Sequence, residues 1–207
     1  MTEKYSTMLE TIRETSDFLR DLENIDLQIA IILGTGLGGL VNDIEIKRKI
    51  NYNDIPNFPV STVDGHKGEL IYGVLGGKPV LAMQGRFHYY EGYSLKEVTF
   101  PIRVMHEMGI NTLFVSNASG GLNPVFRVGD IMMITDHINM FGNNPLIGAN
   151  MDDLGPRFPD MTNAYDPSLR KEAQKIATAH GIELQEGIYV GVSGPTFETP
   201  AEYKMYR

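Results

Sequence analysis

The sequence predicts an α/β fold, a single domain with a central mixed and twisted sheet flanked by helices. Strand-like apolar segments alternate with helical segments along the 207 residues, as in α/β proteins. Two glycines, Gly76-Gly77, separate the apolar segments 69–75 and 78–83 and form a hairpin signal. No internal repeat and no low-complexity linker divides the chain, so we expect residues 1–207 to form one domain.

The spacing of apolar residues predicts the first elements. Segment 5–22 carries apolar side chains at helical intervals and predicts an amphipathic helix. Segment 27–33 is a continuous apolar run, which predicts a buried strand. Segment 44–50 alternates apolar and charged residues and predicts a half-exposed strand. The predicted hairpin of segments 69–75 and 78–83 comes next along the chain.

A second helix is predicted at 94–108, with a clear start and a weak point inside it. Ser94 and Glu97 form a capping box at its beginning, and Gly109 is suited to ending it. Pro101 lies within the segment and should kink or shorten the helix, because proline cannot donate a backbone hydrogen bond.

The second half of the chain predicts strands at 112–116, 130–135 and 187–192, of which the first and last are expected to be buried. A helix at 166–180 begins with an aspartate cap followed by proline. A capping box at 199–202 begins one further helix, which could run for barely two turns. Because so short a helix contributes little by itself, we expect the sequence to stop short of a natural end.

The composition of the chain limits the classes of function that we expect. The net charge is −8 and the pI is near 5.1, without a Lys/Arg-rich run, so a nucleic-acid partner is not expected and any anion site must be local. No apolar stretch is long enough to span a membrane. There is no cysteine and no clustered set of metal-ligating residues, and we expect a cytoplasmic location. The long polar connection 139–165 is expected to be functional or interfacial.

The run 84–92 carries the most chemical information. It follows an apolar strand and places Arg86, His88 and Tyr90 within five residues. If the run is extended, these side chains share one face, because alternate residues of a strand point the same way. A planar, permanently charged guanidinium beside an imidazole is suited to holding a phosphate. A polar strand end with an exposed arginine and histidine is the alternative interpretation.

Two glycine-rich loops follow two predicted strands. Gly34–Gly39 satisfies the G-x-G-x-x-G pattern, but a dinucleotide site would need a following helix and an acidic residue ending the second strand. We favour an oxyanion site in which backbone N–H groups and the Thr35 hydroxyl donate, with a plain surface turn as the alternative. The second loop, 116–123, should lie at the same sheet edge if the two strands are parallel, so both loops are expected to face one ligand.

A third polar cluster, 193–199, follows the predicted strand 187–192. Phe197 could stack on a flat ring, and Glu198 could accept hydrogen bonds from ring N–H groups. Core packing for Phe197 and a charge near a helix start for Glu198 are the simpler interpretations, and they stay open.

Six runs of the chain together resemble the trimeric, low-molecular-mass purine nucleoside phosphorylases. They are 32–38, 65–68, 84–93, 116–123, 157–159 and 194–199. The resemblance spans nearly the whole chain from about Ile29. It implies a nucleoside phosphorylase-like fold and reversible phosphorolysis of purine nucleosides, of the inosine and guanosine type, to free base and ribose 1-phosphate. Inorganic phosphate is then a co-substrate, and no cofactor and no metal is implied.

The same resemblance implies roles for individual residues. The implied phosphate ligands are Thr35, His66, Arg86, His88 and the backbone at Ala118. The implied ribose and base contacts are Tyr90, Asn117, Ala118, Phe158, Phe197 and Glu198. His88 and Glu198 are the implied catalytic residues, Glu198 through the N1–H side of a 6-oxopurine. Phe158 would cover the ribose of a neighbouring subunit, which implies a homotrimer.

Two departures from the family pattern qualify the resemblance. Thr35 stands where some members have serine, and the hydroxyl is kept. Members of the family continue past the position of Arg207 with further site residues, so the resemblance implies a chain shortened at its C-terminus. The alternatives are a fragment that binds phosphate or purine without turnover, and a phosphorylase for 6-aminopurine or methylthio nucleosides. An NAD-dependent oxidoreductase is the least favoured.

Overall fold

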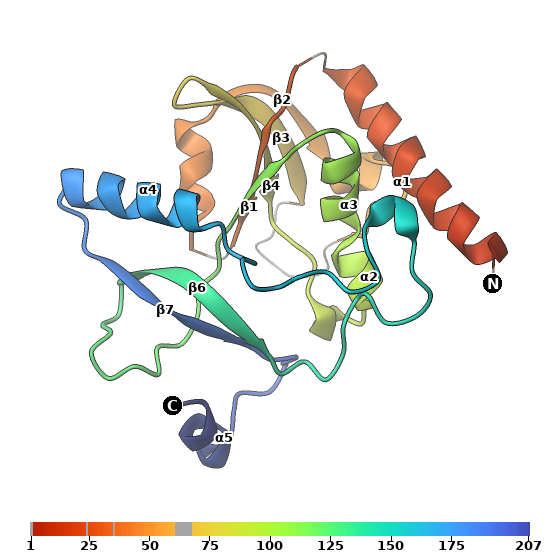
Figure 1. Ribbon diagram of the computed structural model, residues 1–207. Coiled ribbons are helices and arrows are strands. Elements are labelled where there is room, and N and C mark those ends of the chain that lie inside the picture. The colour runs from red at the N-terminus through yellow and green to blue at the C-terminus, as the bar shows by residue number, and fades with distance from the viewer. Residues whose placement is uncertain (1, 24, 35, 61–67) are drawn as a thin grey trace. The chain divides into compact units, whose positions relative to one another are not determined.

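A computed structural model describes residues 2–23, 25–34, 36–60 and 68–207 of the chain (Figure 1). The chain divides into two compact units, Met1–Ala118 and Ser119–Arg207, and each is considered by itself below. The single-domain organisation stays a prediction.

The first unit contains a five-stranded mixed sheet with the order β2-β3-β4-β1-β5. Its strands are β1 (Ile29–Leu33), β2 (Glu45–Asn51), β3 (Glu69–Leu75), β4 (Lys78–Gln84) and β5 (Thr112–Val115). Strand β1 lies between β4 and β5 and runs parallel to both, while β3 is antiparallel to β2 and to β4. The mixed sheet expected from the sequence is therefore confirmed. Gly76 and Gly77, at φ 57° and 76°, form the tight hairpin between β3 and β4.

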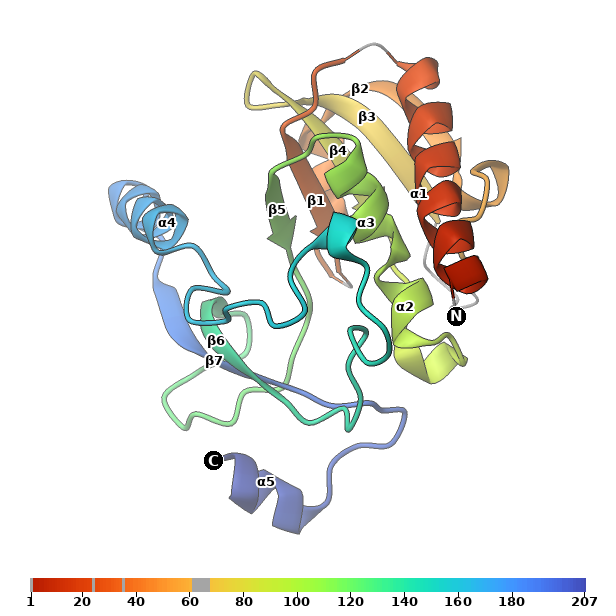
Figure 2. The same cartoon turned by 45° about the vertical axis from the view of Figure 1, so that its right-hand side comes forward.

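Both faces of the sheet are covered at β1, β3 and β4, where neighbouring residues are buried in turn. On one face, Ile31 of β1 and Ile71 of β3 pack with Val41, which lies in the 3₁₀ helix η1 (Gly38–Asp43). On the other face, Tyr72 of β3 donates its hydroxyl to Leu19 O of helix α1 (Thr2–Leu22) at 2.9 Å. Figure 2 shows α3 (Phe100–Glu107) beside α1 on this second face. The alternation of neighbouring strand residues between two buried faces explains the continuous apolar runs in the sequence.

The helix expected at 94–108 is divided in two. Helix α2 (Leu95–Val98) begins at the predicted capping box, in which Ser94 Oγ accepts from Glu97 N. Helix α3 starts after Thr99 and carries Pro101 in its first turn. The predicted effect of Pro101 is confirmed, because proline is tolerated only where its missing N–H is not needed.

The second unit contains two parallel strands, β6 (Ile131–Asn139) and β7 (Leu184–Gly191), with helices α4 (Pro167–Ala179) and α5 (Pro200–Tyr206). Asp166 caps α4 as predicted, since its Oδ1 accepts from the backbone N–H groups of residues 168 and 169 at 2.8 and 2.9 Å. These hydrogen bonds, with the Leu169 amide first, lower the pKa of Asp166. The capping box that begins α5 is confirmed as well.

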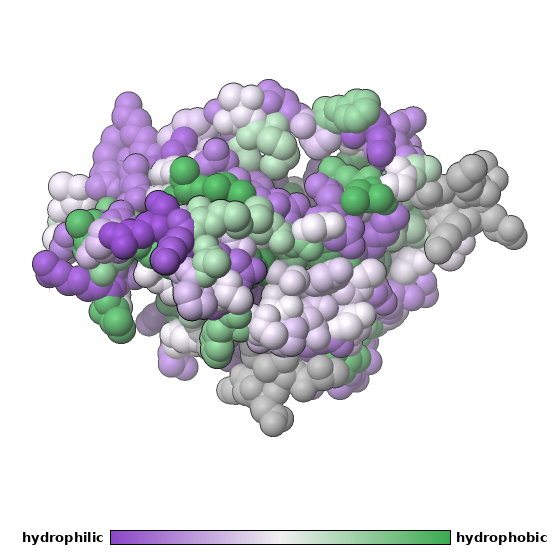
Figure 3. Space-filling model, turned by 90° about the horizontal axis from the view of Figure 1, so that it is seen from below, coloured by the Kyte–Doolittle hydropathy of each residue, from purple (hydrophilic) through white to green (hydrophobic). Residues whose placement is uncertain are grey.

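Two strands expected to be buried are not. Phe114 and Val115 of β5 are 50% and 56% exposed, and Ile188 of β7 is 60% exposed. The reason is position: β5 is the last strand of its sheet, and a two-stranded sheet such as β6–β7 consists of edges alone. Figure 3 shows hydrophobic residues at the surface in small groups among hydrophilic ones. Among the helices of the described residues, none combines the length and apolar character needed to cross a bilayer.

Candidate active site

Three parallel strands of the first unit end at the same edge of the sheet. Leu33 at the end of β1 pairs with Gln84 at the end of β4, and Ile32 pairs with Val115 at the end of β5. The loops that follow therefore begin at one level, where ligands bind in open α/β sheets. The prediction that both glycine-rich loops lie at one sheet edge is confirmed. The run beginning at Gly85 joins them there.

The loops after β1 and β5 touch each other directly. Gly34 N donates to Ser116 Oγ at 3.2 Å, and Ser116 Oγ donates to Ile32 O at 3.1 Å. A Cβ on residue 34 would lie 2.2 Å from Ser116 O and 2.7 Å from Asn117 Cα. Close backbone approach therefore requires glycine at position 34. Ser116, to which the sequence reasoning gave no role, connects the two loops.

Gly34→Ala should lower the free energy of unfolding by about 1–3 kcal/mol, because the new methyl group overlaps the backbone of the neighbouring loop. Chemical denaturation followed by circular dichroism measures the change. Gly38→Ala is the matched control, since no atom lies within 4 Å of a Cβ there and its φ is not positive. The control should be neutral or stabilising by up to about 1 kcal/mol. Equal midpoints for the two variants would contradict the close approach.

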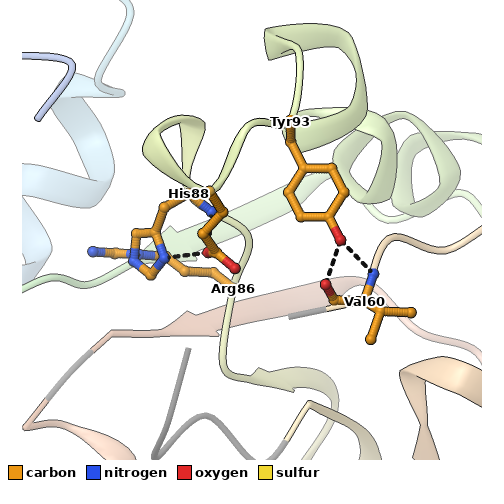
Figure 4. A network of polar contacts seen from close by, with 5 residues as sticks. Val60, Arg86, His88 and Tyr93 are labelled. Carbon is orange, nitrogen blue, oxygen red and sulfur yellow. Dashed lines mark hydrogen bonds and ion pairs between the residues drawn. The ribbon is translucent and has the colours of Figure 1, made fainter. Parts of the chain in front are cut away.

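The side chains of Arg86, His88 and Tyr90 come together as predicted. Arg86 Nε donates to His88 Nε2 at 3.3 Å, and the rings of His88 and Tyr90 stack with centroids 4.8 Å apart. Figure 4 shows Arg86 and His88 side by side. Arg86 Nη1 also donates to Ser116 O at 3.1 Å, which connects the loop after β4 to the loop after β5.

The backbone of this run differs from the prediction. It is extended at His88, with φ −111° and ψ 146°, but Tyr90 lies in the 3₁₀ helix η3 (Tyr89–Glu91). The run is therefore not extended through residue 90, so the condition under which the three side chains would share one strand face is not met. The turn folds the Tyr90 ring back onto the imidazole, so the two side chains meet by stacking rather than by sharing a strand face.

Glu91 holds His88 in place. Its Oε1 accepts from His88 N at 2.8 Å and lies 2.7 Å from Nδ1, and its side chain is only 2% exposed. With Nδ1 donating to this carboxylate, Nε2 is left to accept from Arg86, so the network assigns the tautomer. Sequence reasoning gave Glu91 no role. The three-residue spacing between His88 and Glu91, as in a capping box, is the signal that could have found it.

Thr35 and His66 lie outside the described residues. The residues that flank 61–67 are nevertheless attached to this unit: Val60 N donates to the Tyr93 hydroxyl at 3.2 Å, and that hydroxyl donates to Val60 O (Figure 4). On the other side, Gly68 O accepts from Tyr52 N at 2.8 Å.

Asn117 and Ala118 follow Ser116 in the loop after β5. The Asn117 side-chain amide donates to Ala118 O at 3.0 Å, and Asn117 Cα is the backbone atom that would lie 2.7 Å from a Cβ at Gly34. Both residues therefore lie at the sheet edge to which Arg86 belongs.

The second unit carries the remaining predicted residues. Phe197 is 91% exposed and Phe158 is 87% exposed, so core packing is wrong as an account of Phe197. Glu198 Oε2 accepts from the hydroxyl of Tyr203 at 3.0 Å, a hydrogen bond that raises the pKa of Tyr203. Arg157 lies with its guanidinium 5.8 Å from the Phe158 ring and donates to the carbonyls of residues 146 and 148.

Comparison with known proteins shows the family. Residues 28–207 match the Phosphorylase superfamily. The chain is 52% identical over 200 residues to purine nucleoside phosphorylase 1 of Bacillus subtilis, covering 97% of this chain and 74% of the relative. It is 51% identical over 203 residues to the purine nucleoside phosphorylase of Rattus norvegicus, covering 96% of this chain and 70% of the relative.

This chain belongs to the purine nucleoside phosphorylases. A crystal structure of the purine nucleoside phosphorylase of Schistosoma mansoni in complex with acetate agrees, with a TM-score of 0.90 at 46% identity over 95% of this chain and 74% of that one. Isoform 2 from the same organism, in complex with cytosine and ribose-1-phosphate, gives a TM-score of 0.89 at 45% identity, over 95% of this chain and 70% of that one. The resemblance drawn from the six runs is confirmed.

Because the chain belongs to the purine nucleoside phosphorylases, the interpretation of Gly34–Gly39 as a dinucleotide-binding loop is wrong. In the structure, the loop leads into the 3₁₀ helix η1 and then into β2, which pairs only with the antiparallel strand β3 among the described strands. No α-helix crossover follows the loop within that stretch, so the βαβ unit of a dinucleotide site is missing from it.

Proposed function

We propose that the chain performs phosphorolysis of 6-oxopurine nucleosides, of the inosine and guanosine type, with phosphate held at the shared end of β4, β1 and β5. The observation that carries this is the meeting of Arg86, His88 and the Gly34 loop at that edge. Arg86 supplies a permanent positive charge and a planar set of N–H donors. In this proposal the backbone at Ala118, Thr35 and His66 supply the remaining phosphate donors.

The reaction transfers a ribosyl group between two nucleophiles. A phosphate oxygen forms a bond to the anomeric carbon as the bond from that carbon to the purine nitrogen breaks, and the bonding electrons leave with the base. The sugar passes through an oxocarbenium-like state, which the phosphate anion beneath it balances. Holding phosphate against the anomeric carbon supplies much of the rate advantage by positioning. His88, oriented by Glu91, would hold a phosphate oxygen in this step.

The base side of the site is assigned to three residues. Glu198 would accept a hydrogen bond from the N1–H of a 6-oxopurine and so stabilise the departing base. Phe197 would stack against the purine, and its 91% exposure means that its ring is available to do so. Asn117 would border the purine, and Tyr90, stacked on the His88 ring, would contact the ribose.

A homotrimer in which Phe158 covers the ribose of the neighbouring site belongs to the proposal. The exposure of that side chain supports the trimer. Phe158 is 87% exposed, although the adjacent Arg157 donates hydrogen bonds from the same loop to two backbone carbonyls. An exposed aromatic ring on a fixed loop is suited to an interface. Sedimentation equilibrium of the chain and of Phe158→Ala would test the assembly. Inorganic phosphate is the co-substrate, and a cytoplasmic location stays a prediction.

A coupled assay for hypoxanthine release from inosine tests the activity of the 207-residue chain. The expected result is phosphate-dependent release, with inosine turned over faster than adenosine or methylthioadenosine. Phosphate binding without hypoxanthine release would support the alternative of a binding fragment. Preference for adenosine or methylthioadenosine would contradict the assignment of Glu198 to the N1–H side of a 6-oxopurine.

A further inference from the structure

Tyr52 is a buried tyrosine that contacts the backbone just before Arg86, and the sequence alone gave it no role. It lies in the 3₁₀ helix η2 (Tyr52–Asp54) and is 1% exposed. We propose that Tyr52 is a positioning residue for phosphate, because its hydroxyl holds the peptide group from which Arg86 extends. The inference rests on the proposed phosphate site and names a residue that shapes it without touching phosphate.

The contact is a hydrogen bond from the Tyr52 hydroxyl to Gly85 O at 2.8 Å, a normal distance for a hydroxyl donor. That carbonyl belongs to the planar peptide joining Gly85 to Arg86, so fixing the oxygen also fixes the direction in which Arg86 leaves the backbone. Gly85 has φ 102°, in a region that glycine enters freely. Without a partner for its carbonyl, this peptide would be the loosest point between β4 and the guanidinium.

Tyr52 is rigid enough to act as an anchor. Its ring packs against Phe58 and Phe87, with centroids 5.6 and 5.2 Å away, and Phe87 is the residue that follows Arg86. Burial raises the pKa of Tyr52 well above its ordinary range, and the Glu69 carboxylate adds to the effect. The hydroxyl therefore keeps its proton and remains a donor throughout the working pH range.

The backbone of the same residue holds a second segment. Tyr52 N donates to Gly68 O at 2.8 Å, next to the stretch 61–67 that carries His66. One residue thus joins the flank of that stretch to the peptide before Arg86. Tyr52→Phe keeps the ring and the backbone contacts and removes only the hydroxyl contact, so the contribution of the hydroxyl can be measured by itself.

The test is Tyr52→Phe compared with Tyr72→Phe, both made in the 207-residue chain. Tyr72 is a close match: it is 0% exposed, lies in the same unit and donates its hydroxyl to a backbone carbonyl, Leu19 O, at 2.9 Å. Its partner is in α1, outside the proposed phosphate site. Calorimetric titration with inorganic phosphate gives Kd, and thermal unfolding gives the midpoint. The midpoint temperature of unfolding should fall by a similar amount in both variants.

Only Tyr52→Phe should weaken phosphate binding, by about tenfold, the size of one net hydrogen bond. Tyr72→Phe should stay within twofold of the unsubstituted chain. Equal Kd values for the two variants, or unfolding of Tyr52→Phe alone, would overturn the positioning role and leave the phosphate site standing. If the unsubstituted chain bound no phosphate, the proposed site would fail and this inference with it.

Discussion

Replacing Arg86 by alanine should raise Kd for inorganic phosphate by roughly 30- to 100-fold, about 2–3 kcal/mol, as for a lost charged hydrogen-bond donor. The guanidinium places a permanent positive charge at the shared end of β4, β1 and β5, and it also joins two of the loops there through Ser116 O. Calorimetric titration with phosphate measures the change. KM for phosphate in the coupled assay gives a second reading.

Two further variants separate charge from position. Arg48→Ala removes the same kind of side chain from an ion pair with Glu23 on the same unit, and phosphate binding should be unchanged. Arg86→Lys keeps the charge but loses the planar fork, so its Kd should fall between those of the unsubstituted chain and Arg86→Ala. Phosphate binding that is equally strong in Arg86→Ala and Arg48→Ala would remove the central assignment.

Replacing Glu198 by glutamine should slow inosine turnover by roughly 100-fold, about 3 kcal/mol of barrier. The carboxylate is proposed to accept the N1–H hydrogen bond as the base departs, and glutamine loses the charge that strengthens this bond. Initial rates at saturating phosphate measure the effect. Titration with guanine provides a reading that does not depend on turnover.

Tyr203→Phe is the control for Glu198→Gln. It removes the hydroxyl that donates to Glu198 Oε2 at 3.0 Å but leaves the carboxylate in place. Because this contact is exposed, turnover should change by no more than about threefold. A near-normal rate for Glu198→Gln would mean that Glu198 is only a charge near the start of α5.

Local chemistry made most of the fold predictable. The Gly76-Gly77 hairpin, the Ser94 capping box and the Asp166 cap all depend on residues within a few positions of each other, and all are present. The prediction that β5 is buried was wrong for a different reason. An apolar run shows that a segment favours a strand, whereas its place at the end of a sheet follows from pairing with distant residues.

The candidate site shows the same difference between contacts that are local in sequence, which could be predicted, and long-range contacts, which could not. The Arg86 run was recognisable because its three candidate site residues are near neighbours in sequence. Ser116 and Tyr52 were missed because their contacts, with Gly34 and Gly85, connect residues far apart along the chain. The turn at Tyr90 was missed since glycines around an apparent strand end fit an extended run and a 3₁₀ helix equally well.

The pairings in the first sheet join Ile29 to Val80 on one side and to Thr112 on the other. Helix α1 can form from its own residues, but these pairings require long stretches of chain to close first, at a cost in entropy. During synthesis on the ribosome, the shared end of β4, β1 and β5 therefore cannot assemble before β5 has left the exit tunnel. If phosphate binds across those three strand ends as proposed, it stabilises the closed sheet by mass action, and the free energy of unfolding rises with phosphate concentration.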